Sequence, residues 1–341
     1  MYSFTNDYSE TGHPEIIKAV LEATGQHTGY GEDEICLKAA NKIKAHCEAE
    51  DADVHFVAGG TLTNLLMISS VLRPHQAAIS ADTGHINVHE TGAIEATGHK
   101  ILTAKTPDGK LTPQLIHEIL DVHGNDEHMV QPKLVYISNS TEVGTVYKKA
   151  ELEAIRKICD ENDLYFYLDG ARLGAALTSA QNDTTMADIA RLTDAFYIGG
   201  TKNGAMLGEA LVITKEELKT DFRFLYKQRG AMMAKGWMIG IQFDTLFEND
   251  LFYKLAKHEN ELAAYITEQL KIAGVDFLSD SATNMIFPIF KDSVIEKLYK
   301  QFKFSKWAPA EDCAHVARIV TSWATPRSEA EAFVVAVKAA L

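Results

Sequence analysis

The fold can be read outward from the stretch Leu164-Tyr-Phe-Tyr-Leu-Asp-Gly-Ala-Arg172, in which an apolar run ends abruptly at a carboxylate. A second stretch, Phe196-Tyr-Ile-Gly-Gly-Thr-Lys202, repeats this pattern and ends at a lysine. Short continuous apolar runs are typical of strands that are buried on both faces of a sheet. The two stretches therefore predict two buried strands with charged residues at their carboxyl ends.

Further strands and helices alternate around these stretches. The pattern predicts strands at residues 53–58, 77–81, 133–138, 194–198 and 211–213. It predicts helices at residues 13–24, 32–49, 62–72, 89–97, 111–120 and 150–162. The last strand is expected to return after a hairpin-like turn at residues 204–208. Strands that alternate with helices of about 10–15 residues indicate an α/β fold with a mostly parallel sheet flanked by helices.

The pattern changes after residue 215. Helices are predicted at residues 215–226, 236–273, 293–302 and from 328 onward, and strands at residues 285–290 and 314–321. The longest of these helices is expected to bend near Asn249-Asp250. This order predicts a smaller C-terminal α+β domain. We expect a large domain over residues 1–245 and a small domain over residues 246–341, joined by a long helix.

The composition is that of an ordinary globular protein. The 341 residues are 46% hydrophobic and 23% charged, which excludes disordered, collagen-like and coiled-coil chains. The 33 basic residues are outnumbered by 47 acidic ones, and the net charge of −14 repels phosphate backbones. We therefore expect no nucleic-acid partner.

The chain carries no sign of export or of membrane insertion. The four cysteines lie far apart without a C-x-x-C motif, so we expect buried, reduced thiols and neither disulfides nor a zinc site. The first residues lack the basic and apolar regions of a signal peptide. No apolar run reaches the roughly 18–20 residues that a membrane span needs. These features predict a cytoplasmic protein.

Polar features follow four of the predicted strands. In an open α/β sheet, ligands bind just beyond the carboxyl ends of the strands. The features are Gly59-Gly60-Thr61, the segment from Asp82 to His85, the segment from Asp169 to Arg172, and Thr201-Lys202. Their recurrence predicts a single site along this edge of the sheet.

Each feature also allows a plainer reading. The glycine pair offers bare N–H groups to an anion, or it is only a tight turn before a helix. Asp169 either forms an ion pair with Arg172 or holds the protonated ring nitrogen of a cofactor. Lys202 either forms a Schiff base, as buried lysines readily do, or binds a phosphate or lies at the surface.

Two histidines, His85 and His89, lie four residues apart beside Glu90. On one helix face they could bind a metal, but no third ligand is nearby and the H-E-x-x-H order is absent. The alternatives are core or interface histidines, or an aromatic lid with an acid/base role. We expect no metal at this position.

In this order and spacing, these residues resemble the threonine aldolase family, which has the aspartate-aminotransferase-like fold (fold type I) of pyridoxal-phosphate enzymes and is grouped with the β-eliminating lyases. The motifs that carry the resemblance are Asn6-Asp7, Gly29-Tyr-Gly-Glu-Asp33, Gly60-Thr-Leu-Thr-Asn64, His85, Leu168-Asp-Gly-Ala-Arg172, Thr201-Lys202, Thr283-Asn-Met285 and Arg318-Ile-Val-Thr321. The resemblance thus spans nearly the whole chain.

The resemblance implies pyridoxal 5'-phosphate as the cofactor and assigns roles to matching residues. Lys202 would carry the cofactor as a Schiff base, Asp169 would pair with the pyridine nitrogen, and His85 would stack on the ring. The implied cofactor-binding residues are Gly60, Thr61, His85, Asp169, Arg172, Thr201 and Lys202. The implied substrate-binding residues are Asn6, Tyr30, His89, Thr141, Arg172 and Arg318.

The implied reaction cleaves the Cα–Cβ bond of L-threonine or L-allo-threonine to glycine and an aldehyde by a retro-aldol step. The β-hydroxyl proton needs a base, and His85 or His89, directly or through water, is the candidate. The implied partners are an amino-acid substrate and further copies of the chain, as a homodimer or homotetramer with shared active sites, in which Tyr30 lies near the site of a neighbouring subunit. No membrane or nucleic acid is implied.

The chain departs from the family pattern in three places. Thr141 stands where the family commonly has a histidine, and His89 where it often has a tyrosine, so His89 is hypothesised to supply the missing imidazole. The segment Met232-Met-Ala234 replaces an expected phosphate-binding arginine, for which Arg229 or Lys235 could substitute. Two other readings stay open: a β-eliminating lyase for another amino acid, and a non-catalytic scaffold with this fold.

Overall fold

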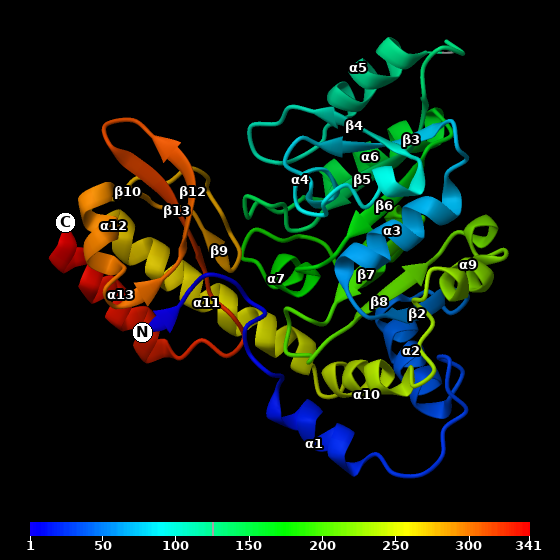
Figure 1. Ribbon diagram of the computed structural model, residues 1–341, viewed down its shortest axis with the longest axis horizontal. Helices are drawn as coiled ribbons and strands as arrows, with labels where there is room; N and C mark the ends of the chain where they lie inside the picture. The colour runs from blue at the N-terminus through cyan, green and yellow to red at the C-terminus, as the bar shows by residue number, and fades with distance from the viewer. Residues whose placement is uncertain (125) are drawn as a thin grey trace.

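The computed structural model describes residues 1–124 and 126–341, and its larger unit is built on a seven-stranded sheet (Figure 1). The strand order is β2-β8-β7-β6-β5-β3-β4. The strands are β2 (Asp53–Val57), β3 (Gln76–Ala81), β4 (Lys100–Ala104), β5 (Gln131–Ser138), β6 (Tyr165–Asp169), β7 (Ala195–Gly199) and β8 (Glu209–Ile213). Strand β8 runs antiparallel to β2 and β7, and the other pairs are parallel.

Helices cover both faces of this sheet. They are α1 (Pro14–Glu22), α2 (Glu34–Cys47), α3 (Gly60–Val71), α4 (His85–Val88), α5 (Pro113–His123), α6 (Lys149–Glu161), α7 (Leu173–Leu177), α8 (Met186–Leu192), α9 (Phe222–Gln228) and α10 (Trp237–Leu246). Successive side chains of a strand point to opposite faces. Accordingly Val135 and Ile137 join the core under α2 and α6, whereas Leu134 and Tyr136 join the core under α3 and α9. The predicted α/β fold is confirmed.

A smaller unit follows. Helix α11 (Leu251–Ile272) leads from the large sheet into it, and Figure 1 shows this helix in yellow between the two units. Strand β13 (Ala314–Val320) pairs antiparallel with β9 (Met285–Ile286), β10 (Ile289–Lys291) and β12 (Ser305–Ala310). Helices α12 (Asp292–Leu298) and α13 (Arg327–Ala340) complete the unit, and its core is separate from those of the large unit.

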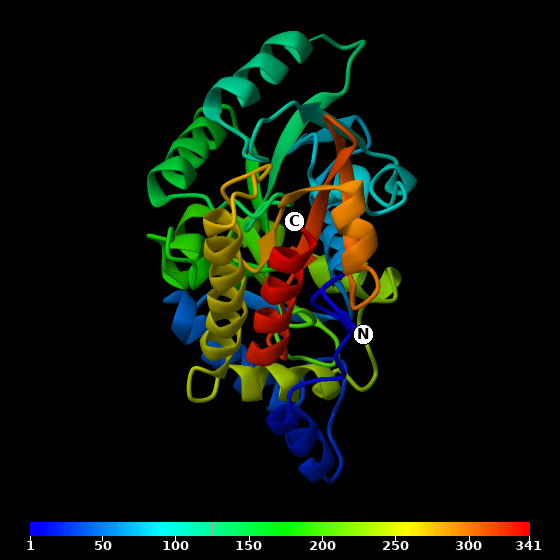
Figure 2. The same ribbon diagram turned by 90° about the vertical axis from the view of Figure 1, so that its left-hand side faces the viewer.

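The first residues of the chain belong spatially to this smaller unit. Strand β1 (Tyr2–Ser3) pairs in parallel with β11 (Phe302–Lys303), and Phe4 is fully buried in the core of the smaller unit. In Figure 2 the N-terminal strand accordingly lies next to α13. The chain then returns to the large unit at α1, so its N-terminal segment crosses between the units.

Three predicted helices are broken, each at residues with left-handed backbone. The helix predicted over 236–273 is two helices, α10 and α11, because Asn249 and Asp250 have φ of 51° and 58°. The helix predicted over 89–97 was wrong: α4 ends at Val88 and a single 3₁₀ turn follows at Glu95–Thr97, with Thr91 at φ 53° between them. The helix over 215–226 divides in the same way, into a 3₁₀ turn at Glu216–Leu218 and α9.

The short strands β1 and β11, strands β4 and β12, helices α7 and α8, and the exposure of one cysteine were not predicted. Strand β4 lies at an edge of the large sheet, and β12 carries Pro309 and the exposed Lys306, so neither shows a strong apolar run. All four cysteines are free, but Cys313 is exposed whereas the other three are buried as expected. No helix in the described ranges has both the length and the hydropathy to cross a membrane.

Candidate active site

Lys202 lies in the turn between β7 and β8, at the carboxyl edge of the large sheet. The N–H groups of Gly200 and Thr201 both donate to the carbonyl of Gly208 at 3.1 Å, which closes the turn. The Gly200 N–H also reaches the Glu209 carboxylate at 2.9 Å. Burial, together with the charge of Arg172, lowers the pKa of Lys202. A lysine in this state readily becomes the neutral amine that a Schiff base requires.

Asp169 ends β6 and is held by three donors. Its Oδ2 accepts from the Tyr136 hydroxyl at 2.6 Å and from Asn64 Nδ2 at 2.9 Å, and its Oδ1 accepts from the Ala171 N–H at 3.0 Å. Burial by itself raises the pKa of Asp169, but the charge of His85 and the hydrogen bonds outweigh it, and the pKa is lowered. The carboxylate is therefore ionised and fixed, with Oδ1 still able to accept a second bond.

The ion pair between Asp169 and Arg172 that the sequence left open does not form. Two nitrogens of the Arg172 guanidinium instead donate to the Asp7 carboxylate, Nε to Oδ2 at 2.6 Å and Nη2 to Oδ1 at 3.1 Å. Asn284 adds a bond to Asp7 Oδ2 at 3.0 Å. The charges of Arg172 and Lys202 overcome the effect of burial and hold the pKa of Asp7 well below its usual range.

His85 begins α4 and faces the same network. Its Nδ1 lies 2.8 Å from Glu90 Oε1, which also accepts from Asn64 at 2.8 Å. Burial lowers the pKa of His85, but the bond to Glu90 and the charges of Glu142 and Asp169 raise it overall. His85 is thus tied, through Asn64, to the carboxylate of Asp169.

His89 follows α4 and is differently placed. Its ring is exposed, with its centroid 5.5 Å from that of His85 and 6.1 Å from that of Trp307. Partial burial and the positive charges of His85, Arg318 and Lys202 lower its pKa, against the opposing charge of Glu142. An imidazole with a lowered pKa is neutral near pH 7 and can accept a proton.

Arg318 comes from β13 of the smaller unit and lies over the Trp307 ring, with its guanidinium 5.3 Å from the ring centroid. Its Nη2 contacts the sulfur of Met285 at 3.4 Å, and its Nε is buried without a hydrogen-bond partner. Burial and the charge of Arg172 lower its pKa. The unused donors of this guanidinium suit a ligand carboxylate.

The segment predicted to meet an anion is the start of α3, which begins at Gly60. Helix α3 has no side-chain cap, so its first N–H groups and the exposed hydroxyl of Thr61 are free to meet an anion. A Cβ atom at residue 60 would lie only 3.0 Å from the Tyr197 hydroxyl, so glycine lets the start of α3 pack closely against this tyrosine. The hydroxyl of Thr201 is already used, since it accepts from the Gly208 N–H at 3.0 Å.

These residues fit pyridoxal phosphate. Its aldehyde needs an amine of lowered pKa, its ring nitrogen an ionised acceptor, and its phosphate a helix N-terminus. Lys202, Asp169 and the start of α3 supply these groups at neighbouring strand ends, and His85 stands beside Asp169. Among the described residues no cluster of metal-ligating side chains is found.

Three of the predicted residues have other contacts in this chain. Asn6 Oδ1 accepts from the Tyr8 N–H and the Ser9 hydroxyl, and its neighbour Asp7 is the residue that binds Arg172. Tyr30 is exposed beside α9, where the Lys227 ammonium lies 4.5 Å from its ring. The buried Thr141 hydroxyl bonds that of Thr145 at 2.7 Å.

Sequence reasoning missed several residues that the fold brings to the site. They are Asp7, Asn64, Glu90, Tyr136, Glu142 and Trp307. Asp7 and Asn64 stand inside motifs quoted above, and could have been found by asking which group neutralises Arg172 and which donates a hydrogen bond to Asp169. Trp307 gives no such signal, because it comes from a strand of the other unit.

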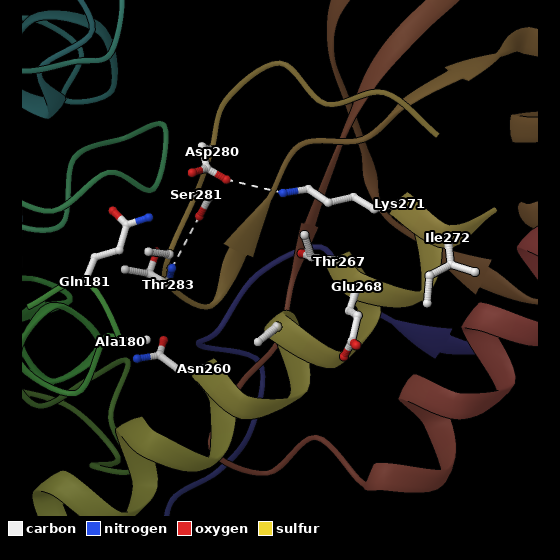
Figure 3. A pocket seen from close by; sticks show the side chains of 12 residues that line it. Ala180, Gln181, Asn260, Thr267, Glu268, Lys271, Ile272, Asp280, Ser281 and Thr283 are labelled. Carbon is white, nitrogen blue, oxygen red and sulfur yellow. Dashed lines mark hydrogen bonds and ion pairs between the residues drawn. The ribbon is translucent and has the colours of Figure 1, made fainter. Parts of the chain in front are cut away.

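A separate cavity of about 420 Å³ lies between the units and away from these residues (Figure 3). It is lined by α11, by residues 180–181 and by residues 280–283, and an ion pair between Lys271 and Asp280 spans 3.4 Å at one side. None of the residues predicted for the active site lines it.

Comparison with known proteins identifies the family and the fold of this chain. A threonine aldolase structure from Leishmania major shares 51% sequence identity, covers 99% of both chains and superimposes with a TM-score of 0.98. A low specificity L-threonine aldolase from a Pseudomonas species is 32% identical over 319 residues, covering 92% of this chain and 90% of its own length. A mutant aspartate aminotransferase from Thermus thermophilus, at 14% identity and a TM-score of 0.73, covers 100% of this chain and 92% of its own, and shares the fold.

The predicted resemblance to the threonine aldolases and the predicted fold are thereby confirmed. The model of the family described as β-eliminating lyase matches residues 4–293, which is most of the chain. The large sheet, with Lys202, Asp169 and His85 at its carboxyl edge, falls inside this range, whereas Trp307 and Arg318 of the smaller unit lie beyond it. This chain is a member of the β-eliminating lyase family.

Proposed function

We propose that this chain is a pyridoxal-phosphate-dependent lyase that cleaves L-threonine, L-allo-threonine and related β-hydroxy-α-amino acids to glycine and an aldehyde. The relatives from Leishmania major and from a Pseudomonas species are threonine aldolases, and the family and the fold imply the cofactor. The observation that carries the proposal is the meeting of Lys202, Asp169, His85 and Arg318 at one edge of the sheet. A scaffold without activity needs none of these groups.

In this proposal Lys202 would hold the cofactor covalently, Asp169 would face its ring nitrogen, His85 its ring, and the start of α3 its phosphate. When bound, pyridoxal phosphate accepts the electron pair that the broken Cα–Cβ bond leaves on Cα. The ionised state of Asp169 is what keeps such a ring protonated. The bond network through Asn64 and Tyr136 holds that carboxylate in place.

Arg318 is proposed to bind the substrate carboxylate, since its Nε has no partner and its ring neighbour Trp307 fixes its plane. Arg172 contributes as the buried support of this region. Because its Nε and one hydrogen of Nη2 are bound to Asp7, the two hydrogens of Nη1 and the second hydrogen of Nη2 are left to be offered to a ligand. Asn6 is proposed to contribute indirectly. Its Oδ1 accepts from the Tyr8 N–H and the Ser9 hydroxyl and so holds the turn that contains Asp7.

His89 is proposed to take the β-hydroxyl proton. It is exposed and its pKa is lowered, so it can accept a proton at neutral pH, whereas His85 is engaged by Glu90. A base positioned in this way typically contributes about 10²–10⁴ in rate. Thr141 would then order the turn next to the hydroxyl and would not bind it directly.

The oligomer and the domain boundary are part of the proposal. We infer a homodimer, or a homotetramer, in which Tyr30 of one subunit serves the site of another, because in its own chain it faces α9. The cofactor would bind a large domain over residues 1–245 and the substrate carboxylate a small domain over 246–341. Cross-linking of the purified protein with and without cofactor tests the assembly.

The function is tested by adding pyridoxal phosphate to the purified protein and recording its visible absorbance. L-Threonine, L-allo-threonine and L-serine are then supplied, and acetaldehyde and glycine are measured. We expect a Schiff-base band and acetaldehyde from both threonine isomers. A band with pyruvate from L-serine and no acetaldehyde would identify a β-eliminating activity, and no band after incubation with the cofactor would overturn the proposal.

A further inference from the structure

Glu90 is a buried carboxylate next to His85 that has no role of its own in the proposed reaction. Only 5% of the residue is exposed. It follows α4, a single helical turn in which the His89 N–H donates to the His85 carbonyl at 2.9 Å. The chain then reverses at Thr91 and Gly92, whose φ angles of 53° and 70° are left-handed. This turn brings the Glu90 carboxylate back to the imidazole at the start of α4.

The Glu90 carboxylate is shared by two neighbours. Its Oε1 lies 2.8 Å from His85 Nδ1 and accepts from Asn64 Nδ2 at 2.8 Å. The same nitrogen of Asn64 donates to Asp169 Oδ2 at 2.9 Å, while its Oδ1 accepts from the Tyr167 hydroxyl at 3.0 Å. Since Asp169 is ionised and can only accept, the amide must turn its nitrogen toward it. One buried nitrogen thus bridges two carboxylates.

The hydrogen-bond pattern also requires Glu90 to be ionised. Its Oε1 faces two nitrogens, and its Oε2 is buried without a hydrogen-bond partner among the described residues. A proton on Oε2 would be a buried donor without an acceptor, and a proton on Oε1 would meet the N–H of Asn64, so both protonated forms are costly. His85 Nδ1 therefore carries a hydrogen and donates it to Glu90.

Two ionised carboxylates bridged by one nitrogen require a positive charge nearby. Like charges held this close destabilise each other unless a cation compensates them. Within the described ranges, His85 is the only cationic side chain in contact with either Glu90 or Asp169. An imidazolium at this position supplies the charge. Its other nitrogen, Nε2, has no hydrogen bond to another described residue, so its N–H is left for a ligand.

The wider surroundings of His85 act in the same direction. The charged groups around it come from four elements: Glu90 after α4, Glu142 after β5, Asp169 at the end of β6 and Lys202 after β7. Burial lowers the pKa of His85, but the bond to Glu90 and the two other carboxylates outweigh burial and the charge of Lys202. The pKa of His85 is therefore raised.

The two histidines of this segment are thus unequal neighbours. The centroids of their rings lie 5.5 Å apart. His89 has no carboxylate in contact within the described part of the chain, and burial and the charge of His85 lower its pKa, against the charge of Glu142. Adjacent groups whose surroundings move their pKa values apart are typical of the acid and the base of one reaction. A hydroxyl between the two rings can donate to His89 and accept from His85.

We propose that Glu90 sets the acid and base roles of this histidine pair: it holds His85 as an imidazolium that donates a hydrogen bond to the β-oxygen of the substrate, and so leaves His89 as the neutral base. This inference rests on the lyase function proposed above. Glu90 is a positioning residue, since it acts through His85. Because its charge matches that of His85, the pair presents no net charge to the cofactor ring.

The step balances in atoms and electrons. The β-hydroxyl proton goes to His89, and the O–H electron pair forms the second bond of the aldehyde carbonyl. The electron pair of the Cα–Cβ bond stays on Cα, which takes up one proton to give glycine. His85 neither gains nor loses a proton, and its hydrogen bond stabilises the negative charge that grows on the oxygen.

The decisive variant is Glu90→Gln, assayed as the loaded enzyme. The side chain keeps its size but loses its charge, so the pKa of His85 should fall by about 1–3 pH units. The basic limb of the kcat/KM profile for L-threonine then moves to lower pH, and kcat/KM at pH 8 falls by about 10–100-fold. A neutral His85 no longer opposes a proton on His89, so the acidic limb moves to higher pH. The exposed Glu95→Gln, in the same segment, is the matched control and should move neither limb.

A second measurement does not depend on turnover. The holoenzyme is labelled with ¹⁵N in its histidine rings, and the NMR signals lost in His85→Asn identify His85. We expect both ring nitrogens of His85 to carry hydrogen at pH 7 in the wild type and in Glu90→Asp, and the titration midpoint to be lower in Glu90→Gln. A neutral His85 in the wild type at pH 7 would overturn the inference, even if Glu90→Gln does not fold.

The inference and the proposed function fail separately. A wild-type holoenzyme that releases no acetaldehyde from L-threonine contradicts the proposed function, and the ring signals then show whether Glu90 holds His85 protonated without it. Cleavage of L-threonine by an enzyme whose His85 is neutral contradicts the inference alone. A lower rate in Glu90→Gln with both limbs and the His85 midpoint unmoved would mean that Glu90 is only structural, and would also overturn the inference. Circular dichroism and the Schiff-base band verify that each variant is folded and loaded.

Discussion

The two sides of the active site are built in different ways. The side formed by β5, β6 and α3 is closed on itself: the Asp169 carboxylate has three donors, and one of them, Asn64, also holds Glu90. The side formed by α4, β12 and β13 carries polar groups without partners, such as Arg318 Nε. On the first side the groups around Asp169 hold one another before any ligand arrives, and the first N–H groups of α3 are left for the cofactor, whereas the second side is completed by the substrate.

This difference separates the lasting parts of the site from the parts that change in each turnover. A cofactor that stays bound requires groups of fixed charge and position, which only a satisfied network can provide. A substrate that comes and goes must supply the missing hydrogen bonds itself. Substitutions on the first side should therefore affect loading or folding, and those on the second side catalysis or affinity.

The largest effect is expected at Lys202, which lies next to the first side in the turn between β7 and β8. Lys202→Ala removes the amine of the Schiff base, so the visible band and all cleavage of L-threonine should disappear together. Absorbance and acetaldehyde release measure both. Cleavage by this variant would contradict the assignment of Lys202 and the division into two sides. Lys157→Ala, on the exposed face of α6, controls for the loss of a lysine in general.

The next effect is expected at His89, on the second side. His89→Phe keeps a ring next to Trp307 but removes the proton acceptor, so the rate of cleavage should fall by about 10²–10⁴. The Schiff-base band should be retained, because the first side is untouched. The Schiff-base absorbance and the release of aldehyde are measured on the same sample of the variant. An unchanged rate would return the role of base to His85 or water.

A stability effect is expected from Asp7→Asn. The change leaves the buried Arg172 without its counter-charge, and breaking such a pair costs about 3–5 kcal/mol in the free energy of unfolding. The pKa of Asp7 is lower in the folded protein than in the unfolded chain. The ion pair therefore stabilises the folded protein fully at any pH above the pKa of the unfolded chain. The stability is lost as the pH falls toward the folded value. Urea unfolding at pH 7 and at acidic pH should show wild type approaching the variant on acidification.

The smallest effect is expected from Trp307→Ala. Loss of the ring under the Arg318 guanidinium removes a contact of about 0.5–2 kcal/mol, so KM for L-threonine should rise by about 2- to 30-fold with little change in kcat. Trp307→Phe keeps a ring face, so its KM should lie between those of the wild type and of Trp307→Ala. Steady-state kinetics distinguish the two parameters, and a fall in kcat alone would remove Trp307 from the substrate side.

The sequence predicted the first side better than the second. Lys202 and Asp169 end apolar strands, and the rule that strand ends meet at one edge is enough to place them together. Asp7 meets Arg172 across 165 residues, and Trp307 reaches His89 from the smaller unit, so no local pattern connects these pairs. The bend expected near Asn249-Asp250 is where α10 and α11 separate, whereas the breaks near Thr91 and Asp221 were missed because left-handed Asp and Thr residues leave no apolar signal.

The crossing of the N-terminal segment has a practical consequence. Within seven residues the chain adds a strand to the smaller unit, buries Phe4 in its core and delivers Asp7 to both Arg172 and Asn284. This segment acts as a clasp between the units, because its strand and Phe4 belong to the smaller unit while its Asp7 binds Arg172 of the large one. An aminopeptidase that trimmed it would open the clasp and inactivate the enzyme while leaving every strand-end residue of the site in place.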